Sequence, residues 1–310
     1  MSTANFSTGR TQTKTYEELL CSPSLVSRLQ QESLSFAALN ILLSITAFAG
    51  NSLILIALHK ESSLHPPSKL FYRCLATTDL LVGLISQPLA VSSWIFSARE
   101  HWIPCRYTST ATFIVSYVLC GVSLLTMTAI SVDRLLALLL GLRYRHIVTL
   151  KRTLVVVTFW VLSSVAALCY KLDHRITTWY GLTVVPLCYV ISIVSFTKIF
   201  CALSHHHAQI RDHVQQPNQP NAVNTTKYKK AVYNALWVQL ALVVCYLPYG
   251  LLEIAIRQSK TYSWYLVIMR GVAGTSTFLN STLNPFLYCW KISEVRQAVK
   301  QTIRQGFSCP

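Results

Sequence analysis

The sequence has few charged residues, and acidic residues are especially scarce. Only 12% of its 310 residues are Asp, Glu, Lys or Arg, whereas soluble globular domains carry about 25%. Hydrophobic residues make up 52% of the chain, and the mean hydropathy is +0.42. This composition excludes most soluble enzymes, because the apolar excess is more than one water-soluble core would bury. We therefore expect lipid to surround much of the chain.

The apolar residues are concentrated in blocks that can each cross a bilayer, which takes a helix of about 20 residues. The seven blocks cover residues 34–58, 70–94, 108–140, 153–170, 179–203, 231–256 and 262–289. The first three blocks do not resemble the last three, so the pattern does not suggest a transporter built from inverted repeats. The predicted fold class is an all-α membrane protein, a seven-transmembrane helix bundle.

Basic residues predict the orientation of this bundle. Lys and Arg number 27 against 11 Asp and Glu, and most of them fall in alternate loops. The positive-inside rule then places the N-terminus outside. We expect an extracellular tail over residues 1–33, a receptor-like bundle over 34–289 and a cytoplasmic segment over 290–310. The inner basic excess suits anionic membrane lipids, and no nucleic acid is expected as a partner.

Polar residues inside apolar blocks are costly, so the few that occur mark functional positions. They stand in the first, second, third, sixth and seventh blocks, as Asn51, Asp79, Asp133-Arg134, Pro248 and Asn284-Pro285-Phe286-Leu287-Tyr288. Together they resemble the signature positions of rhodopsin-like (class A) G-protein-coupled receptors, over residues 34–305. A short second outer loop and the inner segment 142–149 are similar to the branch of melanocortin, lysophospholipid, cannabinoid and adenosine receptors.

The resemblance implies a function without catalysis. Such a chain is a multi-pass plasma-membrane receptor that binds an extracellular ligand and activates a heterotrimeric G protein by helix rearrangement. Two alternatives remain open. One is a non-signalling seven-helix scavenger receptor. The other is a membrane metalloenzyme built on His205-His206-His207 and His213. Because this is one cluster in a polar loop over 204–226, which either is disordered or extends the neighbouring helices, we predict no transition-metal site.

An ionised Asp79 at membrane depth needs compensation, and no Lys or Arg lies in the middle of any block. The resemblance implies an allosteric sodium ion, and no other cofactor. Its ligands are five oxygen-bearing side chains, which suit a hard cation: Asp79, Ser123, Asn280, Ser281 and Asn284. The alternative is a protonated Asp79 that is hydrogen-bonded to Asn51 and Asn284.

The resemblance also implies an activation switch, formed by Asp133, Arg134, Tyr246, Pro248, Asn284, Pro285 and Tyr288. Pro285 kinks its helix and frees a carbonyl that Asn280 and Asn284 can satisfy. On activation Tyr288 swings inward and Arg134 reaches the G protein, which Leu142 also contacts. The alternative for Asp133 and Arg134 is a simple interfacial ion pair. Tyr246 replaces the Trp that is usual in this family. Tyr228 stands where many relatives carry an acid that faces Arg134, so no salt bridge between these helices would hold the resting state. We therefore expect appreciable basal activity.

The predicted ligand cavity is apolar with a few polar anchors, as small-molecule sites generally are. Its residues are Ser116, Tyr117, Cys120, Tyr246, Tyr249, Glu253, Arg270 and Phe278. We expect Glu253 and Arg270 to face each other at the mouth, either contacting the ligand or forming a rim salt bridge of little energy. Arg270 would suit a phosphate or carboxylate, which favours an anionic lipid or acidic peptide. The sequence does not name the agonist.

Modifications are expected at both ends of the chain. The sequon at Asn5 could be glycosylated in the outer tail. In the receptors that the sequence resembles, an outer disulfide usually starts at the position that Ser109 occupies here. Because serine cannot form it, we predict a substitute disulfide that joins Cys105 to Cys21 or Cys169. Residues 291–305 place apolar residues on one helical face, which predicts a short amphipathic eighth helix on the inner membrane surface. Cys309 beyond it is a palmitoylation candidate.

Overall fold

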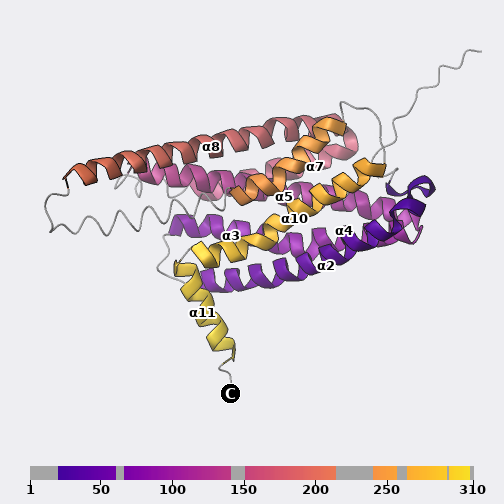
Figure 1. Ribbon diagram of the computed structural model, residues 1–310, viewed down its shortest axis with the longest axis horizontal. Coiled ribbons are helices and arrows are strands. Elements are labelled where there is room, and N and C mark those ends of the chain that lie inside the picture. The colour runs from indigo at the N-terminus through magenta and orange to yellow at the C-terminus, as the bar shows by residue number, and fades with distance from the viewer. Residues whose placement is uncertain are drawn as a thin grey trace, which may run out of the picture.

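The computed structural model describes residues 20–60, 66–140, 151–213, 240–256, 264–291 and 293–307. Nearly all of these residues are helical (Figure 1). The elements are α2 (Pro23–Lys60), α3 (Pro66–Leu81), η1 (Val82–Ser86), α4 (Gln87–Ala98), α5 (Trp102–Leu140), α7 (Lys151–Leu172), α8 (His174–His213), α10 (Trp264–Lys291) and α11 (Ser293–Phe307). A further apolar helix covers Leu240–Ile256. The predicted all-helical class is confirmed for the described residues.

Each predicted block is helical over its described residues, although the helices differ in length and polarity. Residues 231–239 and 262–263 of the last two blocks lie outside the described part of the chain. Four are long and apolar enough to cross a membrane by composition alone: Leu29–His59, Lys69–Ala98, Trp102–Leu140 and Arg175–Ala202. Leu154–Tyr170 and Leu240–Ile256 are shorter apolar helices. The 28 residues of α10 are long enough, but its Asn, Ser and Thr residues lower its hydropathy. These polar residues are the ones that the sequence motifs single out.

One boundary differs from the expected one, and another agrees with one of two expectations. The helix α2 begins at Pro23, so the expected end of the outer tail at residue 33 lies inside a helix. At the other boundary, α8 continues to His213. The first part of the polar segment 204–226 therefore extends α8, which was one of the two expectations for it.

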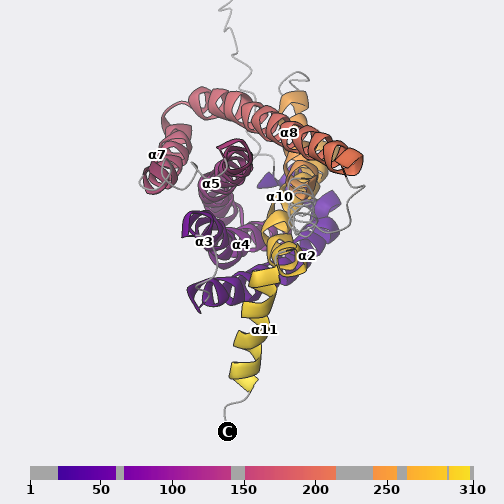
Figure 2. The ribbon, with the colours of Figure 1, turned by 90° about the vertical axis from the view of Figure 1, so that its left-hand side faces the viewer.

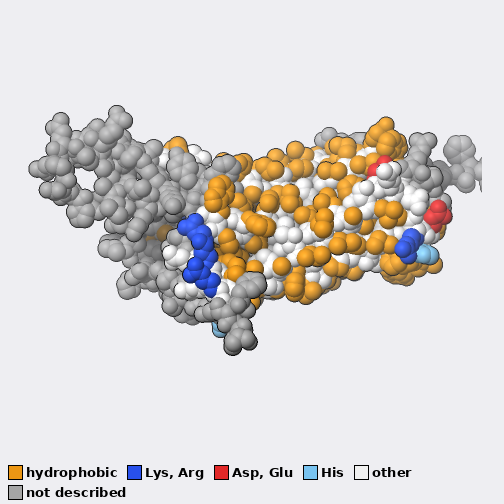
Figure 3. Space-filling model, turned by 60° about the horizontal axis from the view of Figure 1, so that its bottom comes forward, with side chains coloured by type: hydrophobic (Ala, Val, Ile, Leu, Met, Phe, Trp, Pro, Cys, Tyr) orange, Lys and Arg blue, Asp and Glu red, His pale blue; other side chains and the backbone are white. Residues whose placement is uncertain are grey.

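The helices lie side by side in one bundle, and α11 runs sideways from its end (Figures 1 and 2). The central helix is α5, which contacts α3, α4, α7 and α8, while α2 packs against α4 and α10. The largest buried cluster includes Ile54, Leu75, Leu124, Leu242 and Tyr288. Hydrophobic side chains cover the middle of the face shown in Figure 3, with charged side chains towards its ends. An outer surface of this kind suits a lipid environment.

A π-helical turn, η1, interrupts the second span between α3 and α4. The amide of Gln87 donates to the carbonyl of Val82, five residues earlier, and Pro88 follows with no amide hydrogen to donate. Gly83 allows the bulge to lie against α2, because a Cβ there would be 2.9 Å from the backbone nitrogen of Phe48. The Ser44 hydroxyl of α2 donates to the carbonyl of Gly83 at 2.6 Å. The bulge therefore changes which residues of α4 face the bundle.

A disulfide fixes the start of the described chain to the top of α5. It joins Cys21 to Cys105, while Cys169 is a free thiol. Of the two predicted pairings, the structure thus has the one with Cys21. Ser109, at the usual bridge position, lies 3.8 Å from the Cys21 sulfur. The Ser97 hydroxyl also donates to the carbonyl of Leu20 at 2.9 Å, so the segment is held by two kinds of contact.

Candidate functional site

A cavity of about 1030 Å³ lies between α5, α8, the helix Leu240–Ile256 and α10. Its size is at the upper end of the range of small-molecule sites. All eight residues predicted for the ligand cavity line it: Ser116, Tyr117, Cys120, Tyr246, Tyr249, Glu253, Arg270 and Phe278. They come from three helices that are distant in sequence, and the fold brings them together around one space.

The only charged residues that line this cavity in the described chain are Glu253 and Arg270. Their side chains form a salt bridge of 2.7 Å, with Arg270 12% and Glu253 26% exposed. Arg270 also donates to the hydroxyl of Tyr249 at 3.3 Å, and its guanidinium carbon lies 5.9 Å from the centre of that ring. The two charges cancel, so the cavity is close to neutral and has one firmly oriented cation.

Aromatic residues beyond the predicted set also line the cavity, some of them beside the predicted Tyr117. Phe113 packs against Tyr170 with ring centroids 4.3 Å apart, and the Tyr117 hydroxyl donates to the carbonyl of Thr177 at 2.6 Å. Tyr189 of α8 also lines the cavity, with a buried hydroxyl that has no hydrogen-bond partner in the described chain. Buried hydroxyls are normally paired, so this oxygen is available to water or a ligand. No motif in the sequence marks these positions.

The side chains expected around sodium are all buried below the cavity. Asp79, Ser123, Asn280, Ser281 and Asn284 are each at most 1% exposed. The Ser281 hydroxyl donates to Asp79 Oδ1 at 2.8 Å, and the Asn284 amide donates to Oδ2 at 2.7 Å. Ser123 is within hydrogen-bonding reach of the same carboxylate. Both amide atoms of Asn280 are buried without a hydrogen-bond partner in the described chain.

This arrangement fits a hard cation, because its donors are carboxylate, amide and hydroxyl oxygens. The side-chain oxygens of Asn280 and Asn284 are both buried without a donor in the described residues. The alternative of a protonated Asp79 is matched only in part. Asn284 bonds to the carboxyl group as that alternative requires, but Asn51 donates instead to the carbonyls of Ala47 and Ser281, at 2.9 and 3.0 Å.

The carbonyl that Pro285 leaves free has a different partner from the expected one. Proline leaves the carbonyl four residues earlier, that of Ser281, without its helical donor. Asn280 and Asn284 were expected to satisfy the freed polarity, but Asn51 of α2 donates to this carbonyl at 3.0 Å. The helices α2 and α10 approach each other closely here: a Cβ on Gly50 would lie 2.9 Å from the Cγ of Pro285. The kink is therefore tied to α2 and not only to its own helix.

Pro248 lies on an exposed part of its helix. The Ser276 hydroxyl of α10 donates to the carbonyl of Cys245 at 3.1 Å. Tyr246 is 7% exposed and lines the cavity. A hydrogen bond thus connects the helix Leu240–Ile256 to α10 next to the cavity residue Tyr246.

The remaining switch residues meet at the far end of the bundle. Tyr288 is 2% exposed and lies edge-on to Tyr72, with ring centroids 5.4 Å apart. Arg134 donates to the Tyr72 hydroxyl at 3.3 Å. Asp133 is also buried, at 6% exposure. Tyr72 was not predicted as a site residue, and it connects the two signature residues Arg134 and Tyr288.

Several predicted positions lie outside the described residues. These are Asn5, Leu142 and Cys309, together with the side chains of His205–His207 and His213. Within the described part of the chain, no group of three or more His, Cys, Asp and Glu side chains is placed to hold a metal ion.

The chain is similar to known receptors over most of its length. Residues 50–178 match the family described as 7 transmembrane receptor (rhodopsin family). Melanocortin receptor 5 of Mus musculus is 23% identical over 288 residues, which cover 86% of this chain and 84% of that protein. Adenosine receptor A2b of Mus musculus is 25% identical over 324 residues, covering 91% and 93%. These similarities, with the motifs on the apolar helices, support a rhodopsin-like (class A) G-protein-coupled receptor in the melanocortin and adenosine branch.

Proposed function

We propose that this receptor acts in the plasma membrane with its N-terminus outside, binds an extracellular ligand in the cavity and activates a heterotrimeric G protein. One observation carries this proposal. The cavity residue Arg270, the polar residue Asn284 and the switch residue Tyr288 all lie on α10. At 1.5 Å per residue, Arg270 and Tyr288 are roughly 27 Å apart along this helix. A ligand-driven shift of α10 would therefore reach the inner end of the bundle, with no chemistry performed on the ligand.

The cavity favours a ligand that carries a carboxylate or phosphate. Such a group can take the place of Glu253 on Arg270, because guanidinium binds either anion through paired hydrogen bonds. A cationic amine would find only Glu253, already neutralised at 2.7 Å by Arg270. This supports the anionic lipid or acidic peptide that the sequence suggests.

Of these two classes, an anionic lipid has the better support. Val190 and Ile193 of α8 line the cavity, and so do Leu247 and Leu251 of the facing helix. They are 57%, 55%, 40% and 57% exposed, in that order. Apolar residues that are exposed and also line a cavity provide an apolar route between the two helices. An acyl chain can follow this route, whereas a peptide backbone cannot leave its polar groups there.

We also propose that a sodium ion binds at Asp79 and favours the resting arrangement. The buried oxygen donors of Ser123, Asn280, Ser281 and Asn284 support it. An ion held by α3, α5 and α10 together resists their relative movement. Activation would then require that these helices rearrange and the ion leave.

A second-messenger panel in transfected cells tests the receptor proposal. The chain is expressed alone and then exposed to a library that includes lysophospholipids, fatty acids and acidic peptides. We expect one G-protein pathway to respond, and the response to disappear in Arg134→Ala at equal surface expression. If a library member binds and is internalised while every pathway stays silent, the scavenger-receptor alternative replaces this proposal.

A further inference from the structure

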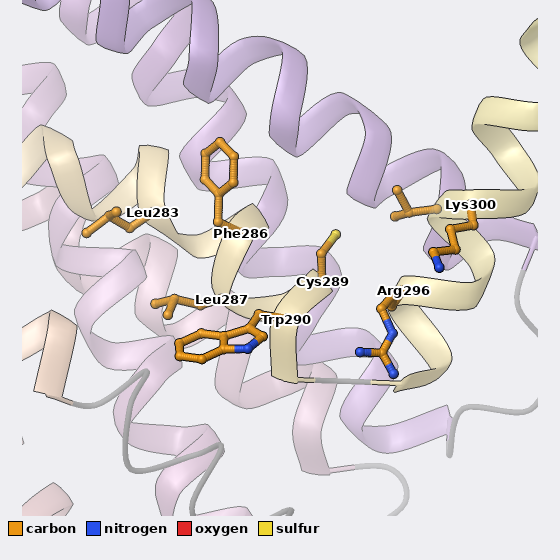
Figure 4. Close-up of a pocket in the computed structure, with 8 residues that line it drawn as sticks. Leu283, Phe286, Leu287, Cys289, Trp290, Arg296 and Lys300 are labelled. Atoms are coloured by element: carbon orange, nitrogen blue, oxygen red, sulfur yellow. The ribbon is translucent and has the colours of Figure 1, made fainter.

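The outer cavity has a feature that another hollow of the structure lacks. That hollow, of about 540 Å³, lies between the end of α10 and α11, where Phe286, Leu287 and Trp290 line it (Figure 4). Among the described side chains, no buried polar atom without a partner lines it. In the outer cavity, the hydroxyls of Ser116 and Tyr189 line the wall and are buried without a hydrogen-bond partner in the described chain. The outer cavity therefore offers polar contacts in addition to its cation.

Tyr189 differs from other tyrosines of the cavity wall. Tyr117 donates to the carbonyl of Thr177 at 2.6 Å, and Tyr249 accepts from Arg270 at 3.3 Å. The side chain of Tyr189 is 9% exposed, and its hydroxyl has no such partner among the described residues. A buried hydroxyl that stays unpaired is unfavourable. The fold thus keeps a polar group here that its own packing does not use.

Tyr189 also lies deeper in the bundle than the salt bridge of the cavity. Glu253 and Arg270 are paired at 2.7 Å, and Tyr246 is seven residues inward from Glu253 on the same helix. Seven residues correspond to roughly 10 Å of helix. Tyr189 and Tyr246 belong to the same core cluster, together with Cys245. Tyr189 is therefore roughly 10 Å inward of the cation at Arg270.

The apolar route between α8 and the helix Leu240–Ile256 opens beside Tyr189. Val190 and Ile193 follow Tyr189 by one and four residues, and Leu247 follows Tyr246 on the facing helix. All three line the cavity and are exposed on the outer surface as well. An acyl chain that begins at Arg270 and leaves by this route passes Tyr189 on its way.

We propose that the cavity selects an acidic lipid that carries a hydroxyl near the middle of its chain. Its carboxylate binds Arg270, its hydroxyl bonds to the hydroxyl of Tyr189, and the rest of its chain follows Val190, Ile193 and Leu247. A plain acyl chain would cover the Tyr189 hydroxyl and give it no partner, whereas a ligand hydroxyl can both donate and accept. This inference rests on the proposed binding of an acidic lipid in the cavity.

The test measures binding to purified full-length receptor in nanodiscs, so it does not depend on a G protein. Three radiolabelled probes are compared: stearic acid, stearic acid with a hydroxyl at the middle of its chain, and stearic acid with a hydroxyl next to the carboxylate. Binding in the cavity is defined as the part that is lost in Glu253→Gln/Arg270→Gln, a double variant that keeps the net charge. We expect the mid-chain hydroxy acid to bind roughly tenfold more tightly than either of the others.

Tyr189→Phe should abolish this preference. The mid-chain hydroxy acid should lose roughly tenfold in affinity, because its hydroxyl is then buried without a partner, while stearic acid should bind at least as well as before. Tyr265→Phe makes the same change at a residue that is 60% exposed and does not line the cavity, and it should keep the preference. The ligand-free Tyr189→Phe receptor should unfold at the wild-type temperature or above, because the lost hydroxyl has no partner in the described chain.

Three results would overturn the inference. They are equal binding of the three acids to the wild type, a preference that survives Tyr189→Phe, and a ligand-free Tyr189→Phe receptor that unfolds several degrees lower. Equal binding that still depends on Glu253 and Arg270 would leave the proposed acidic-lipid site intact. If none of the acids binds in the cavity, this inference and the acidic-lipid class fail together, and the second-messenger panel still decides the receptor function by itself.

Discussion

Arg134 has an unusual partner at the inner end of the bundle. Many relatives would place an acid at Tyr228, which lies outside the described residues, and tyrosine could not form the corresponding salt bridge. The structure instead has the Tyr72 hydroxyl 3.3 Å from Arg134, with the Tyr72 ring against Tyr288. A neutral acceptor holds a guanidinium less firmly than a carboxylate does. Tyr72 thus connects Arg134 to Tyr288, and we expect this three-residue latch to contribute to the resting state.

Tyr72→Phe tests this latch. The variant keeps the ring beside Tyr288 but removes the oxygen that accepts from Arg134. Losing one hydrogen bond to a charged, partly buried group costs about 1 kcal/mol, which corresponds to roughly a fivefold rise in basal signalling. The measurement is the level of second messenger in cells without agonist, at matched surface expression. Tyr107→Phe, at a tyrosine that is 75% exposed, should change nothing, and unchanged basal signalling in Tyr72→Phe would remove the latch.

Asp79→Asn tests the sodium proposal without any known agonist. If the ion binds the folded receptor, sodium at ten times its dissociation constant should add about 1.4 kcal/mol to stability. Purified receptor should then unfold at a higher temperature in sodium chloride than in potassium chloride of equal ionic strength. The difference should vanish in Asp79→Asn and persist in Asp173→Asn, at an exposed turn. A sodium effect that persists in Asp79→Asn would place the ion elsewhere.

At the scale of helices, the sequence predicted the spans because each has a long apolar stretch that lipid requires. It did not reveal the π turn at Val82–Ser86, since a five-residue change of hydrogen bonding leaves hydropathy unchanged. It also missed the early start of α2, because Pro23 to Ser33 is polar and is stabilised by contacts at its ends. Asn51 as the partner of the Ser281 carbonyl was missed for a related reason. Sequence spacing shows which carbonyl Pro285 frees, but not which neighbouring helix is close.

The outer disulfide is the element-scale feature with the largest expected effect. It closes a sequence separation of 84 residues and joins the segment before α2 to α5. Removing a bridge of this kind costs about 2–4 kcal/mol. Cys21→Ser should therefore lower the unfolding temperature of purified receptor by several degrees and reduce its surface expression. Cys169→Ser removes a free thiol and should match the wild type; equal stability of both variants would mean that the bridge contributes nothing.

For the whole molecule, the resemblance to a family located the cavity better than local pattern did. The eight predicted residues line one space, although they come from three helices that are distant in sequence. Tyr189 lies on α8, which carries none of the signature residues, and its place in the wall depends on how α8 packs in the bundle. The cavity, the Asp79 cluster and the Tyr72 latch then follow one another along the bundle. Signal transfer should require all three and a partner at the inner end.

Leu142 is the residue that we expect to meet this partner. The helix α5 ends at Leu140. Leu142 comes two residues later in the sequence, outside the described residues, and the cations Arg143 and Arg145 follow it. An apolar residue in such a position can fill a pocket of the G protein, and an apolar anchor of this kind is worth about 2 kcal/mol or more. Leu142→Asp should therefore reduce coupling about 30-fold, measured as agonist-free G-protein recruitment at equal surface expression. Leu172→Asp makes the same change at the other end of the bundle, at a residue that is 87% exposed, and should couple normally. If Leu142→Asp also couples normally, the G protein must engage this receptor through other residues, with Arg134 the first to examine.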